Sequence, residues 1–123
     1  MSEIEILYVD DEPDILELVE VYFLDQGLKI KTFVDPLQAL ERFGDHPYAL
    51  VISDARMSRM KGVDLLRELQ QRYGYAGKFI IVSGHYELEV VPEQVRGVSR
   101  ILTKPIDFEE LFAVVREALA SKS

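Results

Sequence analysis

The sequence predicts an α/β fold in which a five-stranded parallel sheet carries helices on both faces. Short apolar runs of strand length alternate along the chain with segments whose apolar residues recur at helical spacing. The first of these runs is almost continuously apolar, which is typical of a strand buried on both faces of a parallel sheet. The length of 123 residues suits one domain with a single core.

The first half of the chain contains three predicted strands, which cover residues 4–9, 28–34 and 49–54. Acids followed by Pro13 favour the start of a helix after the first strand, and Gly27 is placed to end it. The second helix is expected to begin with Asp35 as N-cap and Pro36 at the first helical position, and to end at Gly44. Its buried stripe is predicted to be Leu37, Leu40 and Phe43.

The second half contains the other two predicted strands, over residues 78–82 and 99–103. A loop over residues 55–61 leads to a third helix, whose inward-facing residues are predicted to be Val63, Leu66, Leu69 and Tyr73. Residues 84–98 allow a short helix that starts near Pro92, or a distorted one, because a proline inside a helix costs about 3 kcal/mol. Asp107, with Glu110 three residues later, matches a capping box at the start of the last helix.

Acidic residues end the first and third predicted strands. Right-handed crossovers limit the topology, and in the flavodoxin-like strand order 2-1-3-4-5 these two strands are neighbours at the switch point where ligands bind. Asp10 and Asp11 after the first strand should therefore meet Asp54 at the end of the third. Three carboxylates brought together repel one another, so they either bind a cation or have raised pKa values. With oxygen ligands and no histidine or cysteine nearby in sequence, Mg²⁺ is the natural cation.

The fourth and fifth predicted strands bring a hydroxyl and an ammonium group to the same edge of the sheet. Ser83 follows the fourth strand and Lys104 follows the fifth. An acidic cluster of this kind suits phosphoryl transfer to a carboxylate, in which an aspartate is the nucleophile. Lys104 would pair with one phosphoryl oxygen and the hydroxyl of Ser83 would donate to another. The sequence thus predicts phosphoryl chemistry at Asp54.

These residues resemble the receiver domain of two-component response regulators over essentially the whole chain. The matching landmarks, in order, are Asp10-Asp11, Asp54 with Met57 and Gly62 after it, Ser83-Gly84 and Lys104-Pro105. The resemblance implies one receiver domain over residues 1–123, a signalling module rather than an enzyme. It implies that Asp54 accepts a phosphoryl group from the phosphohistidine of a sensor histidine kinase or phosphotransfer protein.

The resemblance also implies a ligand set and an output surface. Asp11, Asp54 and the backbone carbonyl of Arg56 would ligate Mg²⁺ directly, and Asp10 would act partly through water. A cis peptide bond is expected between Lys104 and Pro105, aiming Lys104 at Asp54. Residues 87–119 would form the surface that meets a downstream target or output domain, and a phosphorylation-dependent dimer is compatible with it.

Four positions near the predicted site are unusual or variable in this family. Ser58 stands where the family commonly has proline, and Ile101 stands where it has a phenylalanine or tyrosine whose rotamer reports phosphorylation. Arg56 and His85 fill two variable positions beside the phosphoryl site. The switch is then expected to depend on Ser83 moving toward the phosphoryl group and on the irregular segment around Pro92.

Composition narrows the remaining classes of function. The net charge of −8 argues against direct nucleic-acid binding, because the phosphate backbone would repel such a surface. The absence of cysteine excludes disulfides and thiolate metal sites. No apolar stretch approaches the ~20 residues that span a bilayer, and the first residues lack a basic signal-peptide start. We therefore expect a cytoplasmic protein without a membrane partner.

Two competing functions use the same chemistry or the same fold. A phosphatase of the haloacid dehalogenase type also combines an aspartate nucleophile with Mg²⁺, but it needs a second aspartate two residues after the nucleophile that follows its first strand. Here Asp10 and Asp11 are adjacent, and the chain has no room for a substrate-enclosing cap. An interaction module that has lost phosphorylation is the third reading, and the intact set of acids, Ser83 and Lys104 argues against it.

Overall fold

The computed structural model describes residues 4–84 and 97–120. One parallel sheet has the strand order β2-β1-β3-β4-β5, which confirms the predicted fold class. The strands are β1 (Ile6–Val9), β2 (Ile30–Phe33), β3 (Leu50–Asp54), β4 (Lys78–Ser83) and β5 (Arg100–Thr103). The described helices are α1 (Pro13–Asp25), α2 (Pro36–Arg42), α3 (Gly62–Tyr73) and α4 (Phe108–Ala120), with a 3₁₀ helix η1 (Phe43–Asp45) after α2. The helix predicted near Pro92 lies outside the described residues.

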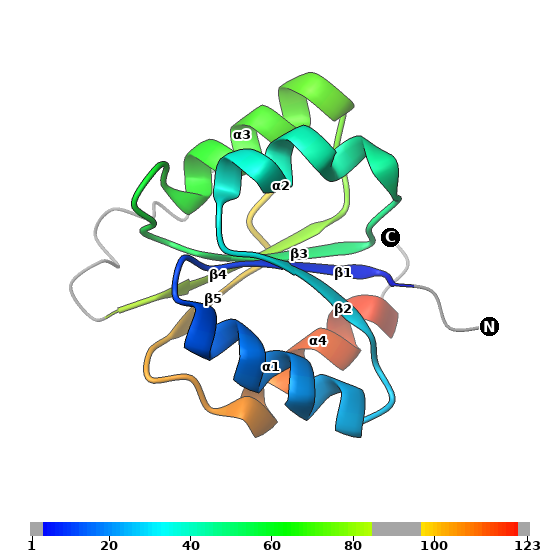
Figure 1. The fold of residues 1–123 in the computed structure, drawn as a ribbon. Helices are drawn as coiled ribbons and strands as arrows, with labels where there is room; N and C mark the ends of the chain where they lie inside the picture. Colours follow the sequence, from blue (N-terminus) through cyan, green and yellow to red (C-terminus); the bar gives the residue numbers. More distant parts are fainter. Residues whose placement is uncertain (1–3, 85–96, 121–123) are drawn as a thin grey trace.

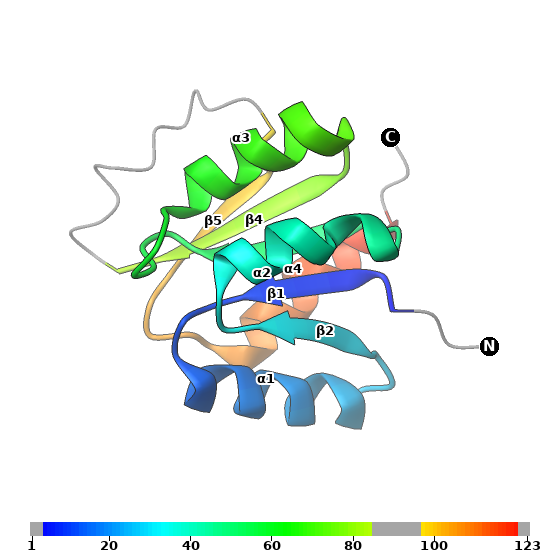
Figure 2. The ribbon, with the colours of Figure 1, turned by 45° about the horizontal axis from the view of Figure 1, so that its top comes forward.

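The helices form two layers, one on each face of the sheet. Helices α2 and α3 cover one face, and α1 and α4 cover the other (Figure 1), and the tilted view separates α1, α2 and α3 (Figure 2). Strand β1 lies inside the sheet, and its successive residues point to opposite faces. Leu7 and Val9 join the core under α2 and α3, whereas Ile6 and Tyr8 join the core over α1 and α4. This two-sided burial explains why the first predicted strand is almost continuously apolar.

Both predicted N-caps are present. Asp35 Oδ1 accepts a hydrogen bond of 3.0 Å from the backbone N–H of Leu37, and Asp107 Oδ1 accepts from the N–H groups of Glu109 and Glu110 at 3.0 and 3.2 Å. These bonds satisfy donors that the first turn of a helix leaves without intrahelical partners. None of the described helices has the length and apolar character needed to cross a lipid bilayer.

Two details of α2 differ from the sequence prediction. Leu37 is 41% exposed, and the buried positions of the helix are Pro36, Ala39 and Leu40. Leu37 lies one residue after Pro36, and one residue turns a helix by about 100°, so its side chain leaves the core face. The α-helix ends at Arg42 rather than at Gly44, because the chain tightens into η1 there. A Cβ atom on Gly44 would lie 3.1 Å from Cε1 of Tyr73, so this glycine serves close packing.

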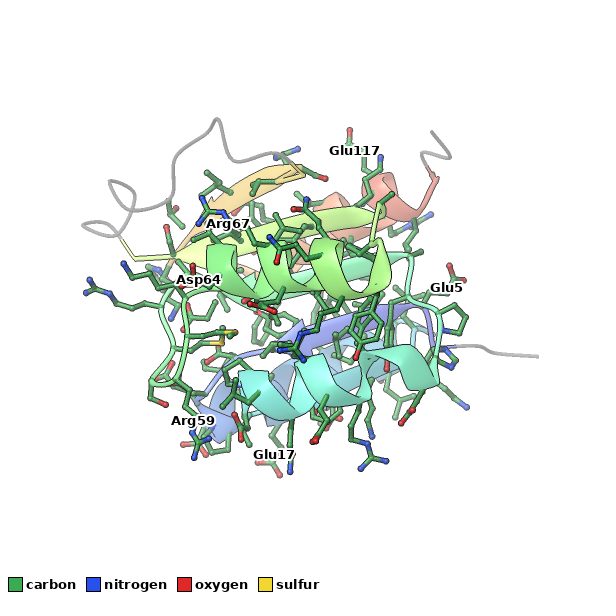
Figure 3. The ribbon with its side chains drawn as sticks, turned by 90° about the horizontal axis from the view of Figure 1, so that it is seen from above. Glu5, Glu17, Arg59, Asp64, Arg67 and Glu117 are labelled. Atoms are coloured by element: carbon green, nitrogen blue, oxygen red, sulfur yellow. The ribbon has the colours of Figure 1, made fainter. Side chains whose placement is uncertain are left out.

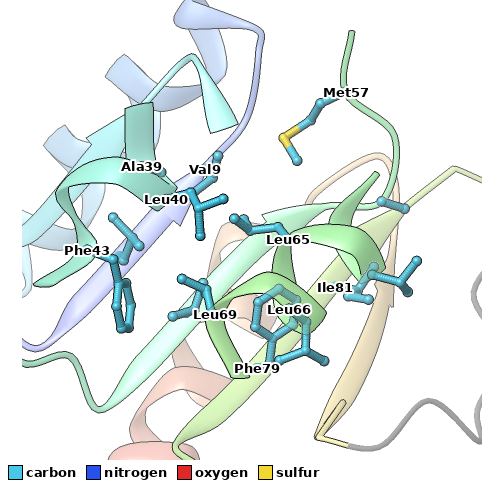
Figure 4. Packing of buried hydrophobic residues seen from close by; sticks show 14 residues of the cluster. Val9, Ala39, Leu40, Phe43, Met57, Leu65, Leu66, Leu69, Phe79 and Ile81 are labelled. Atoms are coloured by element: carbon cyan, nitrogen blue, oxygen red, sulfur yellow. The ribbon is translucent and has the colours of Figure 1, made fainter. Parts of the chain in front are cut away.

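Aromatic residues gather at the amino end of the sheet, where the chain enters β3 and β4. The ring of Phe43 lies 5.1–5.5 Å, between centroids, from the rings of Tyr73, Tyr75 and Tyr48. We call these four residues the amino-end aromatic cluster. The hydroxyl of Tyr73 donates to the carbonyl of Leu40 at 2.7 Å, although the predicted inward-facing Tyr73 remains 39% exposed. The other buried residues of the core between α2, α3 and the sheet are aliphatic except for Phe79 and Met57 (Figure 4).

Candidate functional site

Three carboxylates meet at the carboxyl end of the sheet, where the sequence predicted them. Val9 pairs with Ser53, so β1 and β3 deliver their next residues to neighbouring positions. One carboxylate oxygen from each of Asp10, Asp11 and Asp54 lies within 4.8 Å of the others. Asp10 and Asp54 are buried, and Asp11 is half-buried. Neighbouring strands thus hold three acids in one place with little water to screen them.

Asp10 carries the electrostatic cost of this arrangement. The pKa of Asp10 is raised to about 6, chiefly by burial and also by the charge of Asp54. A hydrogen bond of 2.9 Å from the backbone N–H of Glu12 and the charge of Lys104 act in the opposite direction. A carboxylate in such surroundings is destabilised in its charged form. A cation bound beside it would remove that penalty, so the site favours a positively charged ligand.

Lys104 supplies one positive charge to the cluster. Its Nζ lies 3.0 Å from Oδ1 of Asp54, and its backbone N–H donates to the carbonyl of Ser83 at 2.8 Å. Burial lowers the pKa of Lys104, but the hydrogen bond with Asp54 and the surrounding acids outweigh burial and raise it. The peptide bond between Lys104 and Pro105 is cis, as the sequence resemblance predicted. Lys104 is therefore a permanently charged partner of Asp54.

Ser83 is fully buried at the end of β4. It follows Val82, the residue that pairs with Asp54, and its hydroxyl donates to the carbonyl of Gly84 at 3.3 Å. The backbone N–H of Ala55 donates to the carbonyl of Val82 at 2.8 Å, which continues the pairing of β3 and β4 past Asp54. The predicted hydroxyl therefore lies at the same strand end as Asp54 and Lys104. His85, the other predicted neighbour, lies outside the described residues.

The loop between β3 and α3, residues 55–61, contacts the acidic cluster. At its base, the N–H of Gly62 donates to the carbonyl of Ala55 at 2.9 Å, and Arg56 faces Lys61 in an isolated bridge. Near its tip, the N–H of Ser58 donates to Oδ2 of Asp11 at 2.8 Å. The loop that carries Arg56, whose carbonyl is a predicted Mg²⁺ ligand, is thus connected to one of the three acids.

Arg59 makes a second contact between this loop and a neighbouring turn. Its Nη1 lies 3.9 Å from Oδ2 of Asp35, the N-cap residue of α2. Figure 3 shows Arg59 at the end of the molecule where the loop leaves the sheet. Because both side chains are substantially exposed, this ion pair contributes about 0–1 kcal/mol.

Ser53 and Tyr8 were not predicted as parts of the site, and Gly62, a landmark of the resemblance, has a packing role that the sequence did not reveal. Ser53 is fully buried immediately before Asp54 and donates its hydroxyl to the carbonyl of Asp54 at 2.9 Å. A Cβ atom on Gly62 would lie 2.6 Å from the same carbonyl, so only glycine allows α3 to begin this close to the strand. The hydroxyl of Tyr8 is buried below the acids and has no hydrogen-bond partner among the described residues. Burial raises the pKa of Tyr8, and the charges of Asp10 and Asp54 add to the effect.

Of the two residues that were not predicted, only Ser53 left a signal in the sequence, as a lone polar residue inside the apolar run that leads to Asp54. The burial of the Tyr8 hydroxyl and the close approach at Gly62 depend on tertiary distances that a sequence pattern does not contain.

Comparison with known proteins defines the class. Residues 6–116 match the family described as the response regulator receiver domain, and the chain belongs to this family. It is a signalling domain of two-component systems.

Individual relatives agree with this assignment. The chain is 31% identical over 121 residues to a putative response regulator NtrX-like of Rickettsia bellii, covering 96% of this chain and 25% of the relative. It is 31% identical over 120 residues to the response regulator protein PilR of Pseudomonas aeruginosa, covering 97% of this chain and 27% of the relative. Among solved structures, the receiver domain of NtrX from Brucella abortus has a TM-score of 0.84 at 31% identity, covering 95% of this chain and 99% of that one. The chain spans about a quarter of the length of the two curated relatives.

Proposed function

We propose that this receiver domain accepts a phosphoryl group on Asp54, in a reaction that depends on Mg²⁺. The observation that best supports the proposal is the 3.0 Å contact between Lys104 and Asp54 at the edge of a buried acidic cluster. The donor is the phosphohistidine of a sensor histidine kinase or phosphotransfer protein. The domain acts as a phosphorylated signal and does not turn over a free substrate.

The three acids fit a hard divalent cation. They offer only carboxylate oxygens, which are the ligands that Mg²⁺ prefers, and burial of Asp10 and Asp54 makes their unbalanced charge costly. Asp11, Asp54 and the carbonyl of Arg56 would hold the ion, and Asp10 would contribute partly through water. When bound, Mg²⁺ offsets the negative charge of the phosphoryl oxygens.

The chain's own groups then perform the transfer. A carboxylate oxygen of Asp54 attacks the phosphorus atom, an acyl phosphate bond forms, and the phosphorus–nitrogen bond to the donor histidine breaks with its electron pair leaving on the imidazole. The ammonium group of Lys104 leaves Asp54 and pairs with one phosphoryl oxygen, and the hydroxyl of Ser83 donates a hydrogen bond to another. These contacts stabilise the charge of the transferred phosphoryl group. They also couple the presence of this group to the positions of Lys104 and Ser83.

Residues 87–119 form the output surface, which responds to phosphorylation. The structure describes residues 97–119 of this surface, which include β5 and most of α4. A downstream target, an output domain or a second phosphorylated copy would bind there. Ile101, which has no ring or hydroxyl to exchange between buried and exposed positions, is half-buried against the core under α2 and α3. The proposal therefore assigns the first movement of the switch to Ser83.

Incubation with acetyl phosphate and Mg²⁺, followed by intact-protein mass spectrometry, tests the proposal. The unaltered chain should gain one phosphoryl group, and Asp54→Asn should gain none. Asp64→Asn is the matched control, because Asp64 is an exposed acid of α3 that pairs only loosely with Arg67, at 3.7 Å (Figure 3). Full labelling of Asp54→Asn would refute the assignment of the acceptor.

The same assay separates the two competing functions. Continuous hydrolysis of a phosphate ester would favour the phosphatase reading, and absence of any modification would favour the interaction module. The cytoplasmic location and the absence of nucleic-acid and membrane partners stay predictions.

A further inference from the structure

We propose that the backbone N–H of Ser58 is a positioning group for the Mg²⁺ site, because it holds the Asp11 carboxylate and the β3–α3 loop together before the cation binds. This inference rests on the proposed Mg²⁺ dependence. The observation behind it is the 2.8 Å hydrogen bond from Ser58 N to Asp11 Oδ2, between residues that are 47 positions apart in the chain.

The bond leaves Asp11 able to bind a cation. An ionised carboxylate has two oxygens, each of which accepts, so a hydrogen bond to one leaves the other for a metal ion. Carboxylates that ligate metals are usually hydrogen-bonded in turn, and loss of such an outer partner typically lowers metal affinity by 10–100-fold. Asp11 is only half-buried, so without this bond its side chain would be freer to turn toward solvent. Ordering it during binding would then cost conformational entropy.

The same bond fixes the loop that carries the third proposed ligand. Ser58 lies two residues after Arg56, in a loop whose base is closed by the bond between Gly62 and Ala55. Both described contacts of the loop tip are solvent-exposed, but the ion pair between Arg59 and Asp35 is longer, at 3.9 Å against 2.8 Å. The bond to Asp11 is therefore the stronger described contact of the loop tip, and it relates the carbonyl of Arg56 to the acid with which it would share a cation.

The contact depends on the residue type at position 58. A proline, which the family commonly has there, carries no backbone N–H and cannot donate this bond. Any residue other than proline keeps the donor, so the serine hydroxyl itself is not required. This distinction provides a matched pair of variants, Ser58→Pro and Ser58→Ala.

Titration of the unaltered chain and both variants with Mg²⁺, followed by calorimetry, measures the effect. Ser58→Pro should raise the Kd for Mg²⁺ by about tenfold, and Ser58→Ala should stay within about twofold of the unaltered chain. In the acetyl phosphate assay, the Mg²⁺ concentration for half-maximal labelling should rise by the same factor in Ser58→Pro. The labelling rate at saturating Mg²⁺ should stay unchanged, because a positioning role affects loading rather than the transfer itself.

Two outcomes would overturn the inference alone. Ser58→Pro could bind Mg²⁺ as tightly as the unaltered chain, or more tightly, which would mean that the bond competes with the cation. Ser58→Ala could weaken binding as much as Ser58→Pro, which would transfer the effect to the hydroxyl. Failure of the unaltered chain to bind Mg²⁺ is a different result, because it would remove the proposed cofactor together with this inference.

Amide exchange measured by NMR keeps the inference testable if Ser58→Pro does not fold. The Ser58 N–H should exchange slowly in the metal-free chain and faster in Asp11→Ala, and saturating Mg²⁺ should preserve its protection. Equal exchange rates in the two proteins, or faster exchange on adding Mg²⁺, would contradict the proposed role.

Discussion

At the amino end of the sheet, the hydroxyl of Tyr75 donates to the carbonyl of Lys78 at 2.7 Å and Tyr73 makes the corresponding bond to Leu40, so the polar groups there have partners. At the carboxyl end, Asp10 and Asp54 are buried within one cluster of like charges, and burial raises the pKa of Asp10 to about 6. The first end satisfies its polar groups within the fold, whereas the second holds carboxylates of like charge close together with Lys104 as a positively charged partner. Local conflicts of the second kind are expected at functional sites.

The difference separates the stability of the domain from its function. Substitutions at the amino end should change the free energy of unfolding and leave the binding of Mg²⁺ unchanged. Substitutions at the carboxyl end should change cation binding, and removal of a buried charge there should make the metal-free chain more stable. Four substitutions test this separation, from the largest expected effect to the smallest.

Phe43→Ala should destabilise the fold by about 3–5 kcal/mol, the usual cost of removing a buried phenylalanine side chain. Phe43 is buried and contacts three aromatic neighbours, so the cavity left behind could not easily collapse. Urea unfolding measures the loss, and the folded fraction should still bind Mg²⁺ with unchanged affinity. A loss below about 1 kcal/mol, or weaker Mg²⁺ binding, would contradict the separation of the two ends.

Asp10→Asn should stabilise the metal-free chain at pH 7 by about 2–3 kcal/mol, because one pKa unit corresponds to about 1.4 kcal/mol. The folded chain holds the pKa of Asp10 at about 6, above the ordinary value of 3.8, so the folded state binds more protons than the unfolded state between these values. The stability of the unaltered chain contains a contribution from Asp10 that is lost as the pH rises through this window.

Urea unfolding of the metal-free proteins between pH 4 and pH 7 checks this prediction. As the pH rises, the free energy of unfolding should fall less in Asp10→Asn than in the unaltered chain, because the contribution of Asp10 is missing. The control Asp64→Asn should show the same fall as the unaltered chain. An equally steep decline in Asp10→Asn would assign the pH dependence to another group.

The smallest effect on stability is expected from replacing a tyrosine by phenylalanine, at Tyr75 near the amino end of the sheet and at Tyr8 near the carboxyl end. Tyr75→Phe should cost about 1 kcal/mol, because it removes a hydrogen bond and leaves the carbonyl of Lys78 without that donor. Tyr8→Phe should not lower stability, because the hydroxyl of Tyr8 is buried without a partner among the described residues. Thermal unfolding of the two variants compares them directly. Equal losses would show that the two hydroxyls are in equivalent surroundings.

The sequence predicted the cluster because its position follows from where apolar runs end. The acids and Lys104 are separated along the chain, yet a parallel sheet brings the ends of its strands to one edge, and the structure places Asp10, Asp11, Asp54 and Lys104 together. The exposed position of Leu37 was not predicted, because it depends on the rotation of one short helix about its axis. The bond from Ser58 to Asp11 was also missed, since a backbone N–H leaves no trace in the pattern of side chains.

The central claim is that the carboxyl end of the sheet holds unbalanced negative charge that a cation relieves. Chemical unfolding of the unaltered chain at pH 7, with and without Mg²⁺, tests it most directly. Mg²⁺ at about 100 times its Kd should raise the free energy of unfolding by about 2.7 kcal/mol, and Asp54→Asn should gain only a small part of this increase. No increase in the unaltered chain, or an equal increase in Asp54→Asn, would contradict the account.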